Sequence, residues 1–194
     1  YLDYNASAPI LTEVLDVMID TYKNVPGNAD SRTHLFGTKA QKVVQTSRNT
    51  IADVLGVDQS EVIFTSGSTE SNNTVILGIE EHAELTGKKH IITTAIEHKA
   101  ILEPLKYLEK KGFRVDYVRP NESGRIDADY LLSLIDDETS LVSVMYVNSE
   151  TGIIQPVDII GAALKDTDII FHVDATQALG KLNSEIRNLD YNLM

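Results

Sequence analysis

EVIFTSGSTESNN, residues 61–73, decides how the rest of the sequence is interpreted. The pattern predicts an apolar strand at about 61–65 that runs through a small polar turn into a helix. The first N–H groups of a helix have no partner within it and carry the positive end of its dipole, so such a turn can hold a phosphate. Gly67 allows close approach of a ligand, and Ser68 and Thr69 can contact phosphate oxygens or cap the helix. Taken alone, the same turn is also consistent with an ordinary helix N-cap.

The composition is typical of a globular protein. The chain has 194 residues, 42% hydrophobic and 24% charged, which is enough for one or two domains with a core. No apolar run is long enough to cross a membrane, and the first nine residues lack the character of a secretory signal. We therefore expect a cytoplasmic protein with no membrane partner.

Charge and residue usage narrow the partners and the chemistry. With 17 basic and 29 acidic residues the net charge is −12, which argues against a nucleic-acid partner because phosphate binding needs clustered Lys and Arg. The chain contains no cysteine, so disulfides, thiolate metal sites and a thiol nucleophile are excluded within it. The five histidines are scattered without ligand spacing, so we expect no metal site. Nucleotide-binding glycine motifs and the H-E-x-x-H motif are missing.

Strands and helices are predicted to alternate. Apolar periodicity, glycine stops and β-branched runs predict strands at 61–65, 90–94, 114–118, 141–147 and 168–174, and helices at 11–23, 39–55, about 68–85, 98–111, 126–135 and 157–165. This alternation predicts an α/β fold, with a mainly parallel sheet and helices on both faces. Ligands of such sheets bind at the carboxyl ends of the strands.

Polar residues stand at four of these predicted strand ends. They are Ser68 with Thr69, Glu97 with His98, Asn148 with Glu150, and Asp174 with Gln177. Each set alone can be explained as a cap, a turn former or an ion-pair partner. Together they offer a phosphate cradle, a flat imidazole, an amide and a carboxylate. A carboxylate keeps a nearby pyridine nitrogen protonated, so the combination suits pyridoxal phosphate.

Six colinear segments resemble a known family. They are YLDYNASAP (1–9), GNADSRTHLFG (27–37), FTSGSTESNN (64–73), TAIEHKAIL (94–102), VNSETGIIQP (147–156) and FHVDATQALGK (171–181). In order and content they are similar to the cysteine desulfurases of the NifS and IscS type. These are fold-type-I pyridoxal-phosphate enzymes of aminotransferase class V, and the resemblance covers essentially the whole chain.

The resemblance implies a role for each polar residue. Ser68 and Thr69 would hold the cofactor phosphate, and His98 would stack on the pyridine ring as the candidate catalytic side chain. Asp174 would pair with the pyridinium nitrogen. Asn148 would form a hydrogen bond near the ring oxygen or the substrate, and Gln177 would form one with the ring hydroxyl.

The resemblance also implies a reaction and partners. The family is a group of transferases that remove sulfur from L-cysteine, leaving L-alanine and an enzyme persulfide. The sulfur passes to an acceptor protein for iron–sulfur cluster assembly or tRNA thiolation. A homodimer with active sites near its interface is expected by the same resemblance.

Several family residues are not found in this sequence. In the family the Schiff-base lysine follows a strand that would begin near Asp190 here. The catalytic cysteine and a substrate-binding arginine come after that lysine in the family sequence. Lys99 and Lys181 do not match the lysine's place. Ala29 stands where the family usually has proline, and Ser149 where a second asparagine is usual. We therefore expect the N-terminal half of the enzyme, inactive alone.

The resemblance also implies how the chain divides between two domains, and alternative functions stay open beside it. Residues 1–15 would belong to the small domain and residues 16–194 to an incomplete cofactor-binding large domain. One alternative is a selenocysteine lyase or another class V enzyme. Others are one half of a split enzyme, or a non-catalytic fragment that acts as an interaction module.

Overall fold

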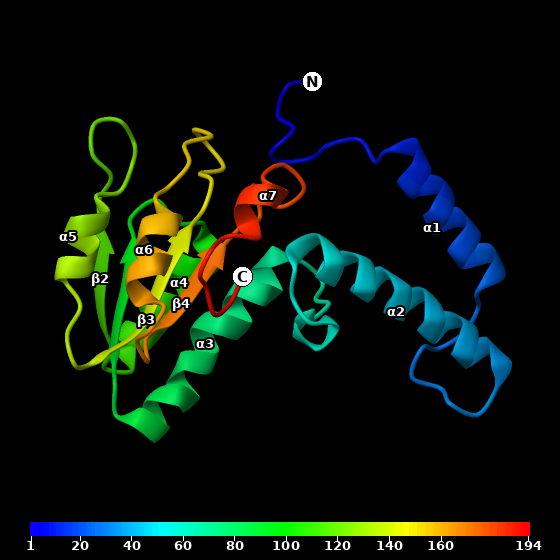
Figure 1. Ribbon diagram of the computed structural model, residues 1–194, viewed down its shortest axis with the longest axis horizontal. Coiled ribbons are helices and arrows are strands. Elements are labelled where there is room, and N and C mark those ends of the chain that lie inside the picture. Colours follow the sequence, from blue (N-terminus) through cyan, green and yellow to red (C-terminus); the bar gives the residue numbers. More distant parts are fainter. The chain divides into compact units, whose positions relative to one another are not determined.

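Helices and strands alternate from residue 68 onward in the predicted order (Figure 1). The structure is a computed structural model that describes residues 1–194, and the chain separates into two units, residues 1–63 and residues 64–194. The expected small-domain and large-domain parts stay a prediction. The elements are α1 (Thr12–Asn24), α2 (Leu35–Leu55), the 3₁₀ turn η1 (Gln59–Glu61), α3 (Ser68–Thr86), β1 (His90–Thr94), α4 (Lys99–Lys110), β2 (Arg114–Val118), α5 (Ala128–Ser133), β3 (Thr139–Met145), α6 (Val157–Leu164), β4 (Ile170–Asp174) and α7 (Asn183–Ile186).

The four strands form one parallel sheet in the order β2-β1-β3-β4. This confirms the predicted α/β class with a parallel sheet, and β1 and β2 have the predicted bounds. β3 begins two residues earlier than predicted and ends two residues earlier. The outer edge of β4 is partly paired as well, because Val173 N donates to Leu193 O at 2.9 Å and His172 forms a parallel bridge with Leu193.

Both faces of the sheet are covered. One buried cluster joins α3 and α4 to β1 and β3, with Ile76, Ile101 and Leu105 of the helices against Ile91 of the sheet. On the other face α6 lies close to β4, since a Cβ at Gly161 would be 3.3 Å from the Phe171 ring. None of the helices in the chain is both long and apolar enough to cross a membrane.

Residues 1–63 contain α1, α2 and η1. α2 begins four residues before its predicted start because His34 caps it: His34 Nδ1 accepts a hydrogen bond from Gly37 N at 3.0 Å. Gly37, which precedes the predicted helix 39–55, lies inside α2. A Cβ there would lie 2.1 Å from Ser31 O, so only glycine fits this close approach.

The predicted strand at 61–65 is wrong. Gln59–Glu61 form η1, and the residues that follow it up to the start of α3 have no regular structure. Asp58 and Glu61 close a capping box, with Asp58 N donating to Glu61 Oε2 at 2.7 Å. A strand needs a neighbour for its backbone groups, and none of the four strands pairs with this segment.

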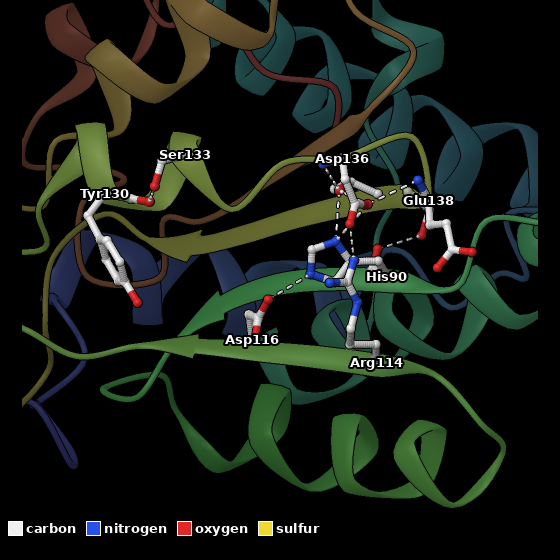
Figure 2. Close-up of polar contacts among 9 residues, drawn as sticks. His90, Arg114, Asp116, Tyr130, Ser133, Asp136 and Glu138 are labelled. Carbon is white, nitrogen blue, oxygen red and sulfur yellow. Dashed lines mark hydrogen bonds and ion pairs between the residues drawn. The ribbon is translucent and has the colours of Figure 1, made fainter.

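A polar cluster holds together the amino ends of three strands (Figure 2). His90 of β1 is completely buried; its Nδ1 lies 2.8 Å from Thr139 Oγ1 of β3 and its Nε2 lies 3.1 Å from Asp116 Oδ2 of β2. Arg114 of β2 pairs with Asp136, which precedes β3. This cluster lies at the edge of the sheet opposite to the strand ends where a ligand is expected.

Candidate functional site

Asp174 ends β4 and is the most firmly held of the predicted site residues. Its side chain is buried, with Oδ2 accepting from Asn72 Nδ2 at 2.7 Å and Oδ1 accepting from Thr176 N at 3.0 Å and Thr176 Oγ1 at 2.6 Å. All three groups donate to carboxylate oxygens, so all three bonds are compatible with an ionised side chain. Asn72 lies on α3, so its bond ties the helix that follows the polar turn to the end of β4.

His98 lies between β1 and α4 and caps the helix. Its Nδ1 accepts a hydrogen bond from Ala100 N at 3.1 Å, and a ring nitrogen that accepts from an amide carries no proton. In the neutral ring the proton is therefore on Nε2. The side chain is exposed, so this bond fixes the ring while leaving it accessible.

The polar turn at 66–69 opens α3 as predicted, although neither predicted hydroxyl caps it. Gly67 is the N-cap and no side chain bonds there; an added Cβ at this position would meet no atom within 4 Å. Glu70 Oε2 instead accepts from Ser66 N at 2.6 Å and from Ser66 Oγ at 2.5 Å, and these bonds lower the pKa of Glu70. The hydroxyls of Ser68 and Thr69 have no hydrogen bond, so the open side of the turn presents free donors.

Asn148 and Gln177 are already engaged by their neighbours. The buried Asn148 accepts at Oδ1 from Glu150 N at 3.0 Å and from Thr151 N at 2.9 Å, which shapes the turn after β3. Its Nδ2 donates to Ile96 O at 3.3 Å, in the loop that leads to His98. Gln177 Oε1 accepts from Lys181 Nζ at 3.2 Å, and no hydrogen bond joins Gln177 to the other predicted residues.

A second asparagine joins the starts of α3 and α4. Asn73 Nδ2 donates to Thr69 O at 2.8 Å and to Ala100 O at 3.3 Å. Together with the bond from Asn72 to Asp174, this connects the polar turn, the His98 loop and the end of β4. Sequence reasoning assigned no role to either asparagine; the available signal was their place in one turn of a helix directly after the predicted phosphate turn.

The electrostatics around Asp174 were not predicted either. Burial raises the pKa of Glu97 to about 8, in spite of hydrogen bonds that lower it, and the charge of Asp174 raises it further. Burial lowers the pKa of His172 to about 4, against the opposing charge of Asp174. At neutral pH both side chains are therefore uncharged.

The predicted site residues together suit a flat ligand that carries a phosphate. Donors gather at the start of α3, and a buried carboxylate among neutral side chains lies at the end of β4. This arrangement suits a ligand with a phosphate at one end and a protonated ring nitrogen at the other. A flat imidazole on α4 can stack on such a ring.

Comparison with known proteins assigns the chain to a family. The aminotransferase class-V family model matches residues 1–194. A mitosomal cysteine desulfurase from Trachipleistophora hominis is 42% identical over 195 residues, covering 100% of this chain and 44% of that protein. The cysteine desulfurase IscS of Buchnera aphidicola subsp. Acyrthosiphon pisum (strain 5A) is 44% identical over 196 residues, covering 100% of this chain and 48% of that protein.

Solved structures agree with these relatives. DndA from Streptomyces lividans superposes with a TM-score of 0.87 at 42% identity, over 97% of this chain and 52% of that one. SspA in complex with cysteine gives a TM-score of 0.91 at 38% identity, over 100% of this chain and 56% of that one. The chain thus spans about half the length of the relatives it matches.

Proposed function

The chain belongs to the aminotransferase class V family, and from that premise we propose that it forms about half of a pyridoxal-phosphate-dependent cysteine desulfurase. The proposed reaction removes sulfur from L-cysteine and yields L-alanine and an enzyme persulfide. Relatives named cysteine desulfurase, which align with the whole chain, support the reaction. The observation that carries the proposal is the buried Asp174 carboxylate, held by Asn72 at the carboxyl edge of a parallel sheet.

The residues of the chain fit the proposed cofactor. Free hydroxyls on Ser68 and Thr69, with the N–H groups that begin α3, would bind its phosphate. Asp174 would accept a hydrogen bond from the protonated ring nitrogen; its Oδ2 accepts one bond from Asn72 and has a second lone pair for another. When bound, the cofactor supplies an electron sink for bonds next to the substrate amino group.

Three further side chains would set the orientation of the ring. His98 would stack on one ring face, since its Nδ1 is fixed by Ala100 N. Gln177 would donate its amide N–H to the ring hydroxyl, because only its Oε1 is engaged by Lys181. Asn148 would act near the ring oxygen or the substrate by fixing the turn after β3, as both ends of its amide are already bonded.

The partners and the location belong to the same proposal. L-cysteine would be the substrate, and an acceptor protein would take the sulfur for iron–sulfur cluster assembly or tRNA thiolation. We further propose a cytoplasmic homodimer, in which residues 1–15 contribute to the small domain and residues 16–194 to the large domain. Transfer chemistry would need a Schiff-base lysine and a thiol. The 194 residues contain no cysteine, and neither Lys99 nor Lys181 matches the place of that lysine.

The test compares Asp174→Asn with Asp168→Asn, which removes an exposed carboxylate just before the same strand. Binding of pyridoxal 5′-phosphate is measured by absorbance, both on this chain and on the intact protein that contains it. Release of L-alanine from L-cysteine is measured on the intact protein only. Asp174→Asn should weaken binding roughly tenfold or more, since a hydrogen bond to a charged group is worth about 1.5–3 kcal/mol. Asp168→Asn should bind as the wild type does.

The outcomes separate the alternatives. Faster release of alanine from L-selenocysteine than from L-cysteine would favour a selenocysteine lyase. Failure of the wild-type intact protein to bind the cofactor would overturn the proposal and favour an interaction module. Equal binding by Asp174→Asn and the wild type would remove Asp174 from the proposed site.

A further inference from the structure

Glu97 joins the carboxyl ends of two neighbouring strands. It lies in the loop between β1 and α4 and is 6% exposed. Its Oε1 accepts from Thr94 Oγ1 of β1 at 2.5 Å and from Met145 N of β3 at 2.9 Å. One carboxyl oxygen therefore fixes the loop to both strands at once, one residue before His98.

The other oxygen of the same carboxyl group, Oε2, is buried and has no hydrogen-bond partner. An ionised carboxylate in this position would leave a charged oxygen without a donor, which is costly. The only charged group that acts on it is the carboxylate of Asp174 at the end of β4, and no positive charge opposes it. His172, which also interacts with Asp174, is neutral at pH 7, so it supplies no positive charge to balance an ionised Glu97. Glu97 is thus a neutral acid at pH 7.

The loop that carries His98 has few other attachments. Ala95 N donates to Val118 O at 2.8 Å, and Asn148 Nδ2 donates to Ile96 O at 3.3 Å. The His98 ring itself has one hydrogen bond, which it accepts from Ala100 N of α4. The place of the exposed ring therefore depends on how the buried residue before it is held.

We propose that Glu97, as a neutral acid bridging β1 and β3, is the positioning residue for His98. This rests on the proposed function, in which the His98 ring contacts the cofactor. Loss of the Glu97 proton places a second anion near Asp174 with one oxygen unsatisfied. Burial and this repulsion outweigh the hydrogen bonds from Thr94 and Met145 N, which favour the ionised form. The carboxylate therefore moves toward water, and the His98 ring leaves its place over the cofactor.

Two substitutions separate positioning from simple stability. Glu97→Gln keeps a carbonyl oxygen for the Thr94 and Met145 donors and cannot ionise, whereas Glu97→Ala removes both bonds. Glu103→Gln is the matched control, because Glu103 lies on the exposed side of α4 in an ion pair with Lys106. All variants are made in the chain and in the intact protein that carries it.

The first measurement uses the cofactor-free chain. The ring signals of His98 are followed by NMR from pH 6 to pH 9.5. In the wild type and in Glu103→Gln they should shift with a midpoint near 8, the pKa of Glu97. In Glu97→Gln this step should be absent, with the pH 7 spectrum retained.

The second measurement is pyridoxal 5′-phosphate binding to the intact protein, at a temperature well below unfolding. Glu97→Ala should bind about two- to tenfold more weakly, because the displaced His98 ring loses its stacking contact with the cofactor. Glu97→Gln should match the wild type at pH 7 and keep its affinity at pH 9, where the wild type loses affinity.

Three results would overturn the proposal. They are unmoved His98 signals in folded Glu97→Ala, a step near pH 8 that persists in Glu97→Gln, and weak binding by folded Glu97→Gln. If Glu97→Ala does not fold, the wild-type titration against Glu97→Gln decides alone. If the wild type binds no cofactor, the proposed function fails while the NMR titration still tests whether Glu97 positions His98.

Discussion

The buried acid Glu97 makes the stability of the chain depend on pH. Its pKa, about 8, is above the ordinary value of 4.5 for a glutamate side chain. Between these values the folded chain holds a proton that the unfolded chain has lost, so the free energy of unfolding falls as the pH rises from 4.5 and levels off above 8. We expect Glu97→Gln to remove this fall, which is on the order of a few kcal/mol, as measured by urea unfolding at pH 5 to 9. A slope unchanged from the wild type would mean that Glu97 is already ionised at neutral pH.

His172 should produce the opposite dependence. Its pKa in the folded chain, about 4, is below the ordinary value of 6.5 for a histidine side chain. Between these values the unfolded chain binds a proton that the folded chain does not, so the free energy of unfolding falls as the pH drops from 6.5 to 4. Relative to the wild type, His172→Gln should be less sensitive to acid in this range. Parallel urea titrations of the two proteins at pH 4 to 7 test this, and equal acid sensitivity of the two would contradict it.

The positions of the candidate site residues were partly predictable from sequence. Asp174 and His98 were predicted to lie at strand ends because a buried run of β-branched residues predicts a strand, and the polar residues that follow lie at its end. Asn72 could not be paired with Asp174, since 102 residues separate them and only the packing of α3 on the sheet brings them together. The unsatisfied oxygen of Glu97 depends in the same way on which groups surround it.

Among the elements, α4 contains a proline, and a side chain of α3 replaces the backbone hydrogen bond that the proline cannot form. Pro104 has no N–H to donate to Ala100 O, four residues earlier, and that carbonyl accepts from Asn73 Nδ2 of α3 at 3.3 Å instead. Asn73→Ala should therefore destabilise the chain by about 1–3 kcal/mol.

A double-mutant cycle with Pro104→Ala isolates this effect. The substitution restores a backbone N–H for Ala100 O, so Asn73→Ala should cost less in the Pro104→Ala background than in the wild type. The bond from Asn73 to Thr69 O is lost in both backgrounds and cancels. Urea unfolding of the four proteins gives the coupling free energy, and a value of zero would show that the proline and the asparagine act independently.

Elements were predictable where the sequence itself specifies them. β1 (HIITT) is rich in β-branched residues, β2 (RVDYV) lies between the breakers Gly112 and Pro120, and the bounds of both match. Asp127 accepts from Tyr130 N at 3.1 Å and caps α5, and an aspartate at the start of a helical pattern is a typical N-cap signal. The segment 61–65 has the same apolar character as these strands but no strand beside it, so its sequence could not reveal that it would remain unpaired. Hydrophobic pattern predicts a strand, and only a neighbour makes one.

At the scale of the whole molecule, the α/β class was predictable from the alternation of elements, whereas the separation at residue 63 was not. The amphipathic patterns of α1 and α2 predict that each helix packs, without saying against what. In the structure α1 buries no residue, and most apolar side chains of residues 1–63 are exposed. Residues 64–194 contain the sheet and nearly all of the buried core.

This difference predicts unequal protection against hydrogen exchange in the two units. α2 and α3 are a matched pair of 21 and 19 residues, but α2 buries only Gly37, Ala40 and Ala52 whereas α3 packs Ile76 and Ile79 into the core. Amides exchange through local openings that are resisted by buried apolar contacts, so peptides of α2 should exchange at least about tenfold faster than those of α3. Peptide-level hydrogen–deuterium exchange of the chain measures this. Ile79→Ala should speed exchange in α3 and leave α2 unchanged. Equal protection of the two helices in the wild-type chain would show that the apolar side chains of α2 are covered in solution, because helical hydrogen bonds without packing do not protect for long.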